Sequence, residues 1–237
     1  MISDDGLELY FGSDRPGGAG GVDIYVAKRA SKQDAFTSAL PIVEIDTPLD
    51  EDDPFLEPDG LALWWNVQGD IVRATRPDRM SGWNTPVLVA ELNSPNGSDD
   101  APAFTADGLT VYFDSERPGT LGMLDLWSAT RPTRTSAFSN LRHETVASTN
   151  SFDCCAHVLP GETQVAFTTQ RAGMSKIYVS DGLADGSLGT AIPYPLVNTA
   201  GRDFDIFATP DGTTVGVSSD RAPSAGVDLW LYERSCP

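Results

Sequence analysis

The sequence predicts an all-β protein: a β-propeller of five blades with four antiparallel strands each, in which the first and last blades are incomplete. A Pro-Asp-Gly or Asp-Gly phrase, or a variant of it, followed by a strand and a turn returns five times, at Gly6, Gly60, Gly108, Glu162 and Gly212. Subtraction gives intervals of 54, 48, 54 and 50 residues, which is the range of propeller blades. Apolar residues in the repeats alternate with a period of two, and this excludes a helical repeat.

Each repeat contains four runs that predict strands, separated by Gly, Pro and Asp residues that favour tight turns. The run after the Asp-Gly turn includes 7–11 and 109–113. The run after the Gly-rich turn includes 23–27, 125–129 and 228–232. The third run includes 42–45, 87–92 and 194–197, and the run that enters the next blade includes 54–57, 102–105, 156–159 and 206–209. Sheets that are apolar on both faces stack between two neighbours, as blades do.

We expect a single propeller domain over 1–237, with blades near 1–48, 49–96, 97–150, 151–200 and 201–237. The run that should precede Gly6 is missing, and so is the run that should follow 228–232. Either the five blades close with a thin seam, or the natural protein has more chain than this.

Composition narrows the classes of partner. The formal net charge is -18 and the pI is near 4.2, so a phosphate backbone would be repelled and nucleic acid is excluded as a partner. Solvated acidic loops that keep an all-β protein soluble would give the same composition. No apolar run approaches the roughly 18 to 20 residues of a membrane span, and the N-terminus has no charged-then-apolar leader.

Three phrases carry a resemblance to a known family: SDRPGGAGGVDIYVAKR, DEDDPFLEPDG and SDDAPAFTADGLTVYFDSERP. They resemble the TolB-type, WD-like propeller repeats named for their Pro-Asp dipeptide, as found beside OmpA-like domains in bacterial envelope proteins. The resemblance spans essentially the whole chain. It implies a periplasmic or secreted bacterial protein that serves as an interaction scaffold, while similar propellers also serve as lyases, peptidase accessories or hydrolases.

Two repeats depart from this pattern. In the second, 66–69 replaces the long Arg-Gly turn; in the fourth, Lys176 replaces the usual Asp and 154–157 replaces the Asp-Pro stretch. We expect functional residues at these departures from the otherwise even repeat.

The run that enters each blade begins with acidic residues. In a propeller this strand is the innermost, so these carboxylates should surround one mouth of the central channel. Converging carboxylate oxygens suit Ca²⁺ or another divalent cation. The predicted ligands are Asp53, Asp100, Asp153, Asp203 and Asp205. The structural alternative is that acidic residues here cap turns by accepting backbone N–H bonds.

The fourth repeat also carries Cys154, Cys155 and His157. On a regular strand Cys155 and His157 face one way and Cys154 the other, so the pair could bind a metal or form a thiolate activated by imidazole. The spacing does not match a zinc site, and a buried cysteine is also an ordinary apolar filler. Because the two cysteines are adjacent, we expect at most one of them to bridge to Cys236.

Histidine and arginine have simpler interpretations. His143 is expected at the surface of an outer strand. Four turn arginines could bind anions, but are expected to pair within their own blades, with Asp23, Asp125 or Asp228 as partners. They are Arg15, Arg117, Arg171 and Arg221.

Two functions follow. The first is a ligand- or protein-binding scaffold that uses the acidic channel mouth and nearby loops, with a protein or glycan of the envelope, or a small molecule in the channel, as partner. The alternative is a metal-assisted hydrolase of phosphotriesters, lactones or esters. Its catalytic residues would be His157, as acid and base, Asp153 and Cys155, and neighbouring carboxylates should raise the pKa of His157. Apart from the cation, no cofactor is expected.

Overall fold

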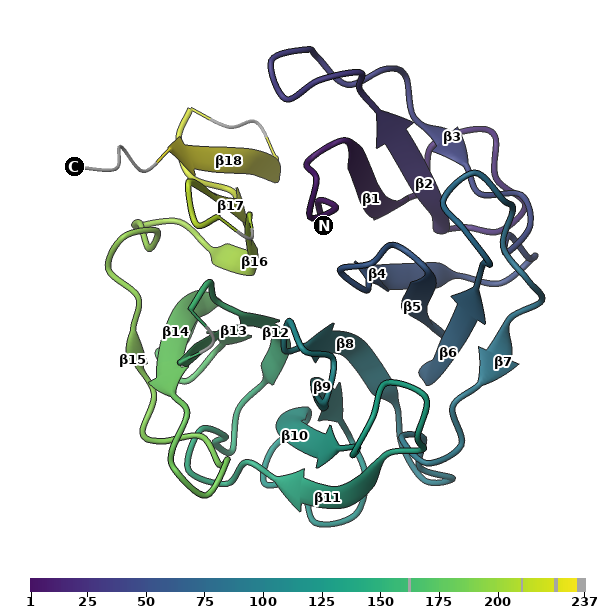
Figure 1. Ribbon diagram of the computed structural model, residues 1–237. Helices are drawn as coiled ribbons and strands as arrows, with labels where there is room; N and C mark the ends of the chain where they lie inside the picture. Colours follow the sequence, from purple (N-terminus) through teal and green to yellow (C-terminus); the bar gives the residue numbers. More distant parts are fainter. Residues whose placement is uncertain (162, 210, 224–225, 234–237) are drawn as a thin grey trace. The chain divides into compact units, whose positions relative to one another are not determined.

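The computed structural model describes residues 1–161, 163–209, 211–223 and 226–233, and all regular secondary structure in them is β (Figure 1). The strands form five sheets; the second, third and fourth along the chain have four strands, and the first and last have three. This confirms an all-β, five-bladed β-propeller with incomplete end blades. Glu162, one of the five repeat positions, lies outside the described residues. Within the described part, no helix is long and apolar enough to cross a membrane.

The chain forms two compact units, residues 1–102 and 103–237, and the boundary falls within β8. That one domain spans the whole chain stays a prediction. The first unit contains the sheets β1-β2-β3 and β4-β5-β6-β7. Their strands are β1 (Glu8–Ser13), β2 (Asp23–Lys28), β3 (Leu40–Pro41), β4 (Glu51–Leu56), β5 (Ala62–Val67), β6 (Asp70–Thr75) and β7 (Val87–Leu88).

The remaining three sheets are β8-β9-β10-β11, β12-β13-β14-β15 and β16-β17-β18. The strands of the first are β8 (Asp99–Phe104), β9 (Thr110–Ser115), β10 (Asp125–Thr130) and β11 (Ser139–His143). Those of the second are β12 (Asp153–Val158), β13 (Gln164–Thr169), β14 (Lys176–Asp181) and β15 (Ile192–Pro193). Those of the last are β16 (Asp203–Ala208), β17 (Thr214–Ser219) and β18 (Asp228–Glu233).

Apolar side chains from neighbouring sheets pack together within each unit, as two-faced apolar strands require. In the first unit one cluster comprises Tyr10, Ile24, Ile42, Ile45, Leu56, Leu63, Trp65 and Ala74. In the second, a cluster comprises Leu159, Ala166, Ile177, Val179, Tyr194, Val197, Ile206, Val215 and Val217. Within the units, β4 lies against β1 and β2, β12 against β9 and β10, and β16 against β12, β13 and β14.

The first strand of four sheets contains the same irregularity. Its third residue has a positive φ: 53° at Asp53, 49° at Ala101, 59° at Cys155 and 49° at Asp205. In β4, β12 and β16 the pairing register with the next strand shifts around this residue, which is a β-bulge. Strict alternation of side chains therefore stops at the third residue of each such strand.

The bulge makes a prediction for stability, because a left-handed conformation costs a residue with a Cβ atom about 1 kcal/mol. Replacing Ala101, whose φ is 49°, by Gly removes that cost and should change the free energy of unfolding by no more than about 0.5 kcal/mol in the destabilising direction. The same change at Ala103, buried in the same strand, should destabilise by about 1 kcal/mol or more. Urea unfolding of both variants checks this, and equal losses would contradict the assignment of the bulge.

Candidate functional site

The first strand of every sheet after the first begins with a buried carboxylate. Glu51, Asp99, Asp153 and Asp203 all have 0% exposure. Each accepts hydrogen bonds from a Thr or Ser in the loop before it, as when Thr149 N donates to Asp153 Oδ2 at 2.6 Å and Thr199 N to Asp203 Oδ2 at 2.7 Å. The equivalent donors to Glu51 and Asp99 are Thr47 and Ser94. These contacts are those of turn caps.

Two turn arginines neutralise these carboxylates. Arg171 donates to Asp153 Oδ1 at 3.0 Å, and Arg221 to Asp203 Oδ1 at 2.7 Å. Pairing within the blade is therefore confirmed for both. In both cases this carboxylate begins the first strand of the blade, a position that was not among the expected partners Asp23, Asp125 and Asp228.

Asp203 binds a second cation, Lys176, which begins β14. Lys176 Nζ lies 2.9 Å from Asp203 Oδ2 and also donates to the carbonyl oxygens of Thr199 and Gly201. Burial alone would raise the pKa of Asp203, but the hydrogen bonds from Thr199, Lys176 and Ser219 together outweigh it and lower that pKa. Lys176, one of the departures from the repeat, therefore stabilises the carboxylate of the next blade.

Cys154 and Cys155 form a disulfide with each other. Both sulfur atoms are therefore already bonded, which agrees with the expectation that at most one of them bridges to Cys236; Cys236 itself lies outside the described residues. In this form Cys155 has no free thiol, and a nucleophilic role would require reduction first.

The bulge at Cys155 also corrects the predicted facing of these side chains. Cys154 pairs with Thr168 and His157 with Ala166. Because Thr168 and Ala166 are two residues apart on β13, Cys154 and His157 share a face of the sheet. The regular strand assumed from the sequence placed Cys155 there instead.

His157 accepts a hydrogen bond at Nε2 from the backbone N–H of Ala208, 3.0 Å away on β16. The expectation of a raised pKa is wrong: burial lowers the pKa of His157 to about 4. At neutral pH the ring is uncharged and holds two first strands together through its acceptor nitrogen.

His143 is not a free surface residue. Its ring stacks on Trp127 with centroids 4.6 Å apart, and its Nε2 lies 2.8 Å from Asp125 Oδ2. The sequence did not predict the contact between His143 and Asp125. His143 ends β11, a short outer strand whose first three residues are exposed, and a histidine on such a strand is expected to be exposed as well.

The other predicted metal ligands occupy more open places. Asp53 is half-buried and accepts a hydrogen bond from Asn66 Nδ2 at 2.9 Å, Asp100 is half-buried, and Asp205 is exposed. Asp153 and Asp203 are the turn caps described above. A cation shared by these five residues stays a prediction.

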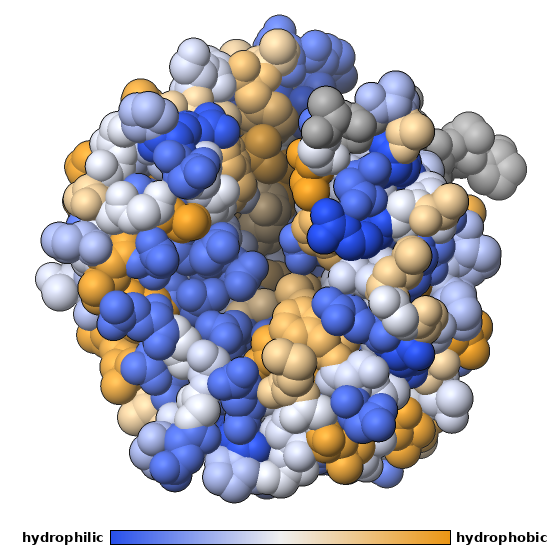
Figure 2. All heavy atoms as spheres, turned by 180° about the vertical axis from the view of Figure 1, so that it is seen from behind, coloured by the Kyte–Doolittle hydropathy of each residue, from blue (hydrophilic) through white to orange (hydrophobic). Residues whose placement is uncertain are grey.

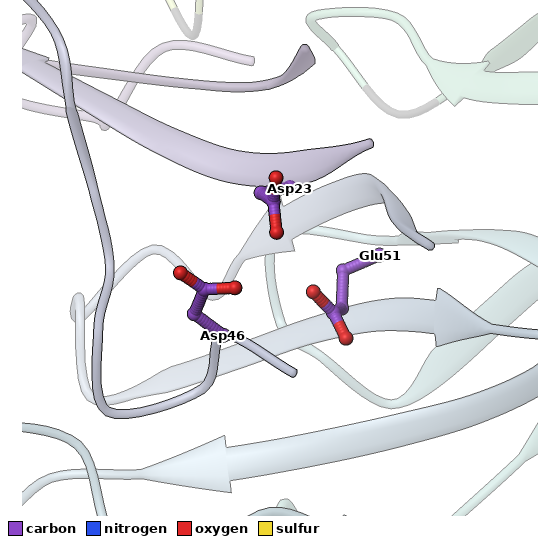
Figure 3. A group of neighbouring side chains, drawn as sticks. All are labelled: Asp23, Asp46 and Glu51. Atoms are coloured by element: carbon purple, nitrogen blue, oxygen red, sulfur yellow. The ribbon is translucent and has the colours of Figure 1, made fainter. Parts of the chain in front are cut away.

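A different set of carboxylates is brought together in the first unit (Figure 3). Among the described residues, one group of three or more His, Cys, Asp or Glu places its ligand atoms within 4.8 Å of one another: Asp23, Asp46 and Glu51. The pKa of Asp46 is raised, first by burial and then by contact with Asp23, and burial raises the pKa of Glu51.

Sequence reasoning did not single out Asp46. A signal was present: the second and fourth blades carry Asn93 and Asn198 at the same place, and the third carries Ser148. These neutral side chains bond the second residue of the third strand, for example Asn198 Oδ1 with Ile177 N at 2.9 Å. Asp46 bonds Ala19 N instead.

Comparison with solved structures finds other β-propellers. TolB from Acinetobacter baumannii has a TM-score of 0.62 and 16% identity, over 98% of this chain and 51% of that one. A putative TolB from Agrobacterium tumefaciens has a TM-score of 0.62 and 17% identity, over 98% and 75%. Oligogalacturonate lyase from Vibrio parahaemolyticus has a TM-score of 0.52 and 11% identity, over 98% and 60%.

No family model matches this chain, and no curated protein matches its sequence. The chain spans about half the length of the first TolB structure above. At these identities the similarity shows a TolB-like propeller fold and nothing finer.

The turn-cap carboxylates make a second prediction. Asp203→Asn leaves Lys176 and Arg221, both largely buried, without their anion, and should cost about 3 kcal/mol of unfolding free energy. Asp220→Asn breaks an exposed pair with Arg202 and should cost about 1 kcal/mol or less. Urea unfolding at pH 7 compares the two, and similar losses would contradict the framework role.

The lowered pKa of Asp203 sets the direction of its pH dependence. A carboxylate whose folded pKa lies below its unfolded value of about 4 stabilises the fold above that pH and loses this contribution as the pH falls through the folded pKa. The difference in unfolding free energy between the wild type and Asp203→Asn should therefore decrease as the pH is lowered below about 4, and urea unfolding over a range of pH measures it.

Proposed function

We propose that this chain is a binding propeller of the bacterial envelope and that it presents acidic loops to a protein partner with a basic surface. The supporting observation is a run of carboxylates at the start of β4. Asp50 and Asp52 are exposed, and Asp53 is half-buried. The pKa of Asp52 is raised, first because nearby protein displaces water from its carboxylate and then because of the negative charge of Asp50.

The backbone holds this run in place. A Cβ atom at Gly12 would overlap the Asp52 carboxylate, so the side chain lies directly against β1. Asp50 accepts a hydrogen bond from Val22 N at 2.9 Å. Fixed and crowded carboxylates are better stabilised by an added cationic group than freely moving ones, because no ordering is required on binding.

One face of the molecule offers many polar contacts. Figure 2 shows hydrophilic residues spread across this face, with hydrophobic residues among them. With a net charge of -18, approach of a basic protein is favoured over long range and should weaken with salt.

The disulfide supports a location outside the cytoplasm. Disulfides persist in oxidising compartments such as the bacterial periplasm, and Cys154–Cys155 is such a bond. The resemblance to envelope propeller repeats points the same way.

The hydrolase alternative has less support. With a pKa of about 4, His157 carries no proton on Nε2 to donate near neutral pH, and that nitrogen already accepts from Ala208 N. A general acid works best when its pKa lies near the working pH.

Binding can be tested with an oligolysine peptide as the basic probe. The double variant Asp50→Asn/Asp52→Asn should bind it about five-fold or more weakly than the wild type, because each exposed pair contributes up to about 1 kcal/mol. The matched control Asp34→Asn/Glu116→Gln removes two exposed acidic charges elsewhere and should bind almost as well as the wild type. Calorimetry at two salt concentrations measures both.

If the two double variants bind oligolysine equally weakly, binding depends on net charge alone, and this would contradict the proposed binding surface at Asp50 and Asp52. Turnover in an ester and lactone screen that is lost in His157→Gln would favour the hydrolase.

A further inference from the structure

The three clustered carboxylates of the first unit are joined from separate segments. Asp23 begins β2, Glu51 begins β4, and Asp46 lies in the loop between β3 and β4 (Figure 3). Asp23 is 2% exposed and Glu51 0%. Buried carboxylates at this spacing repel one another strongly unless a proton or a cation lies among them.

Hydrogen bonds satisfy only part of this cluster. Asp23 Oδ1 accepts from the backbone N–H groups of Ala19 and Gly20, at 3.1 and 2.9 Å. No N–H group of a described residue donates to the other oxygen, Oδ2, and the group that Asp23 contacts within the cluster is another carboxyl, that of Asp46. Among the described residues, no Lys or Arg forms an ion pair with any of the three carboxylates.

The equivalent places in the second unit contain cations. Where β14 meets β16, Lys176 occupies the position of Asp23: Asp23 begins β2 and pairs with the last residue of β1, and Lys176 begins β14 and pairs with the last residue of β13. Lys176 Nζ lies 2.9 Å from Asp203 Oδ2, and Arg221 binds the other oxygen. Where β10 meets β12, Arg171 binds Asp153.

The place where β2 meets β4 has neither a lysine like Lys176 nor a turn arginine like Arg171 and Arg221, and the sequence shows why. The turn from β5 to β6 contains only Gln68 and Gly69, so this blade has no counterpart of Arg171 or Arg221. Asp23 stands where the fourth blade has Lys176, and Asp46 stands where it has Asn198. Compared with the place where β14 meets β16, this place therefore has two cationic groups fewer and two carboxylates more.

We infer that Asp23, Asp46 and Glu51 bind a divalent metal ion, Ca²⁺, which supplies the positive charge that Lys176, Arg171 and Arg221 supply in the other blades. Ca²⁺ binds oxygen ligands at about 2.3 to 2.6 Å, so two ligands of one ion lie at most about 5 Å apart. The ligand atoms of this cluster all lie within 4.8 Å of one another. Asp46 is half-buried, which leaves one side for the waters that complete the coordination.

Ca²⁺ fits this set better than Mg²⁺. Two of the carboxylates begin strands and the third lies in a loop, and Ca²⁺ tolerates irregular sets of oxygen ligands where Mg²⁺ requires near-octahedral ones. The ion would join the loop 14–22, which Asp23 and Asp46 hold through Ala19 N, to the start of β4.

The test uses chelator-treated wild-type protein titrated with CaCl₂, followed by calorimetry and thermal unfolding, with NaCl at equal ionic strength as reference. One ion should bind, and Tm should rise by about 5 °C once Ca²⁺ exceeds its Kd a hundred-fold. MgCl₂ should have a smaller effect. Absence of a Ca²⁺-specific heat and of a Tm rise beyond that in NaCl would overturn the proposal.

The decisive variant is Asp46→Asn, because it installs the residue that the second and fourth blades carry at this place. It should weaken Ca²⁺ binding at least ten-fold and, in chelator, unfold at a higher temperature than the wild type, since one repelling charge is gone. Asp14→Asn is the matched control, an exposed acid on the same loop outside the cluster. Retention of the full Ca²⁺-dependent Tm rise in Asp46→Asn, or its equal loss in Asp14→Asn, would contradict the assigned ligands.

Discussion

The buried carboxylate at the start of the first strand is the interaction on which the rest of the structure depends. It ties the preceding loop to the blade through Thr or Ser donors, as Thr199 does with Asp203. A buried negative charge is costly unless it is hydrogen-bonded and neutralised. A carboxylate in this place therefore requires both hydrogen-bond donors and positive charge around it.

The blades meet this requirement differently, and the differences explain the irregular residues. Arg171 neutralises Asp153 alone, while Arg221 and Lys176 act together on Asp203. The second blade has neither group beside Glu51, and the carboxylates of Asp23 from β2 and of Asp46 from the loop before β4 lie there instead. A residue that departs from the repeat, such as Lys176, is thus explained by the charge balance of the neighbouring blade before any catalytic role is needed.

The candidate site was harder to predict than the fold, and the bulge of the first strand is one reason. Period-two reasoning placed Cys155 beside His157, but the extra residue reverses the facing and puts Cys154 there. The sequence also suggested a raised pKa for His157 from nearby acids, whereas burial dominates and lowers it. The first residues of the entering strands were expected either as metal ligands or as turn caps, and Asp153 and Asp203 make the contacts of caps.

By itself, the sequence determined the all-β class, the five repeats and the incomplete end blades, because a fifty-residue period and two-residue alternation reflect local strand geometry. Only the tertiary structure decided which charges meet. Asp23, Asp46 and Glu51 belong to three segments whose distance in space depends on how one sheet packs on the next. Electrostatic interaction depends on that distance and on burial, and neither can be read from order along the chain.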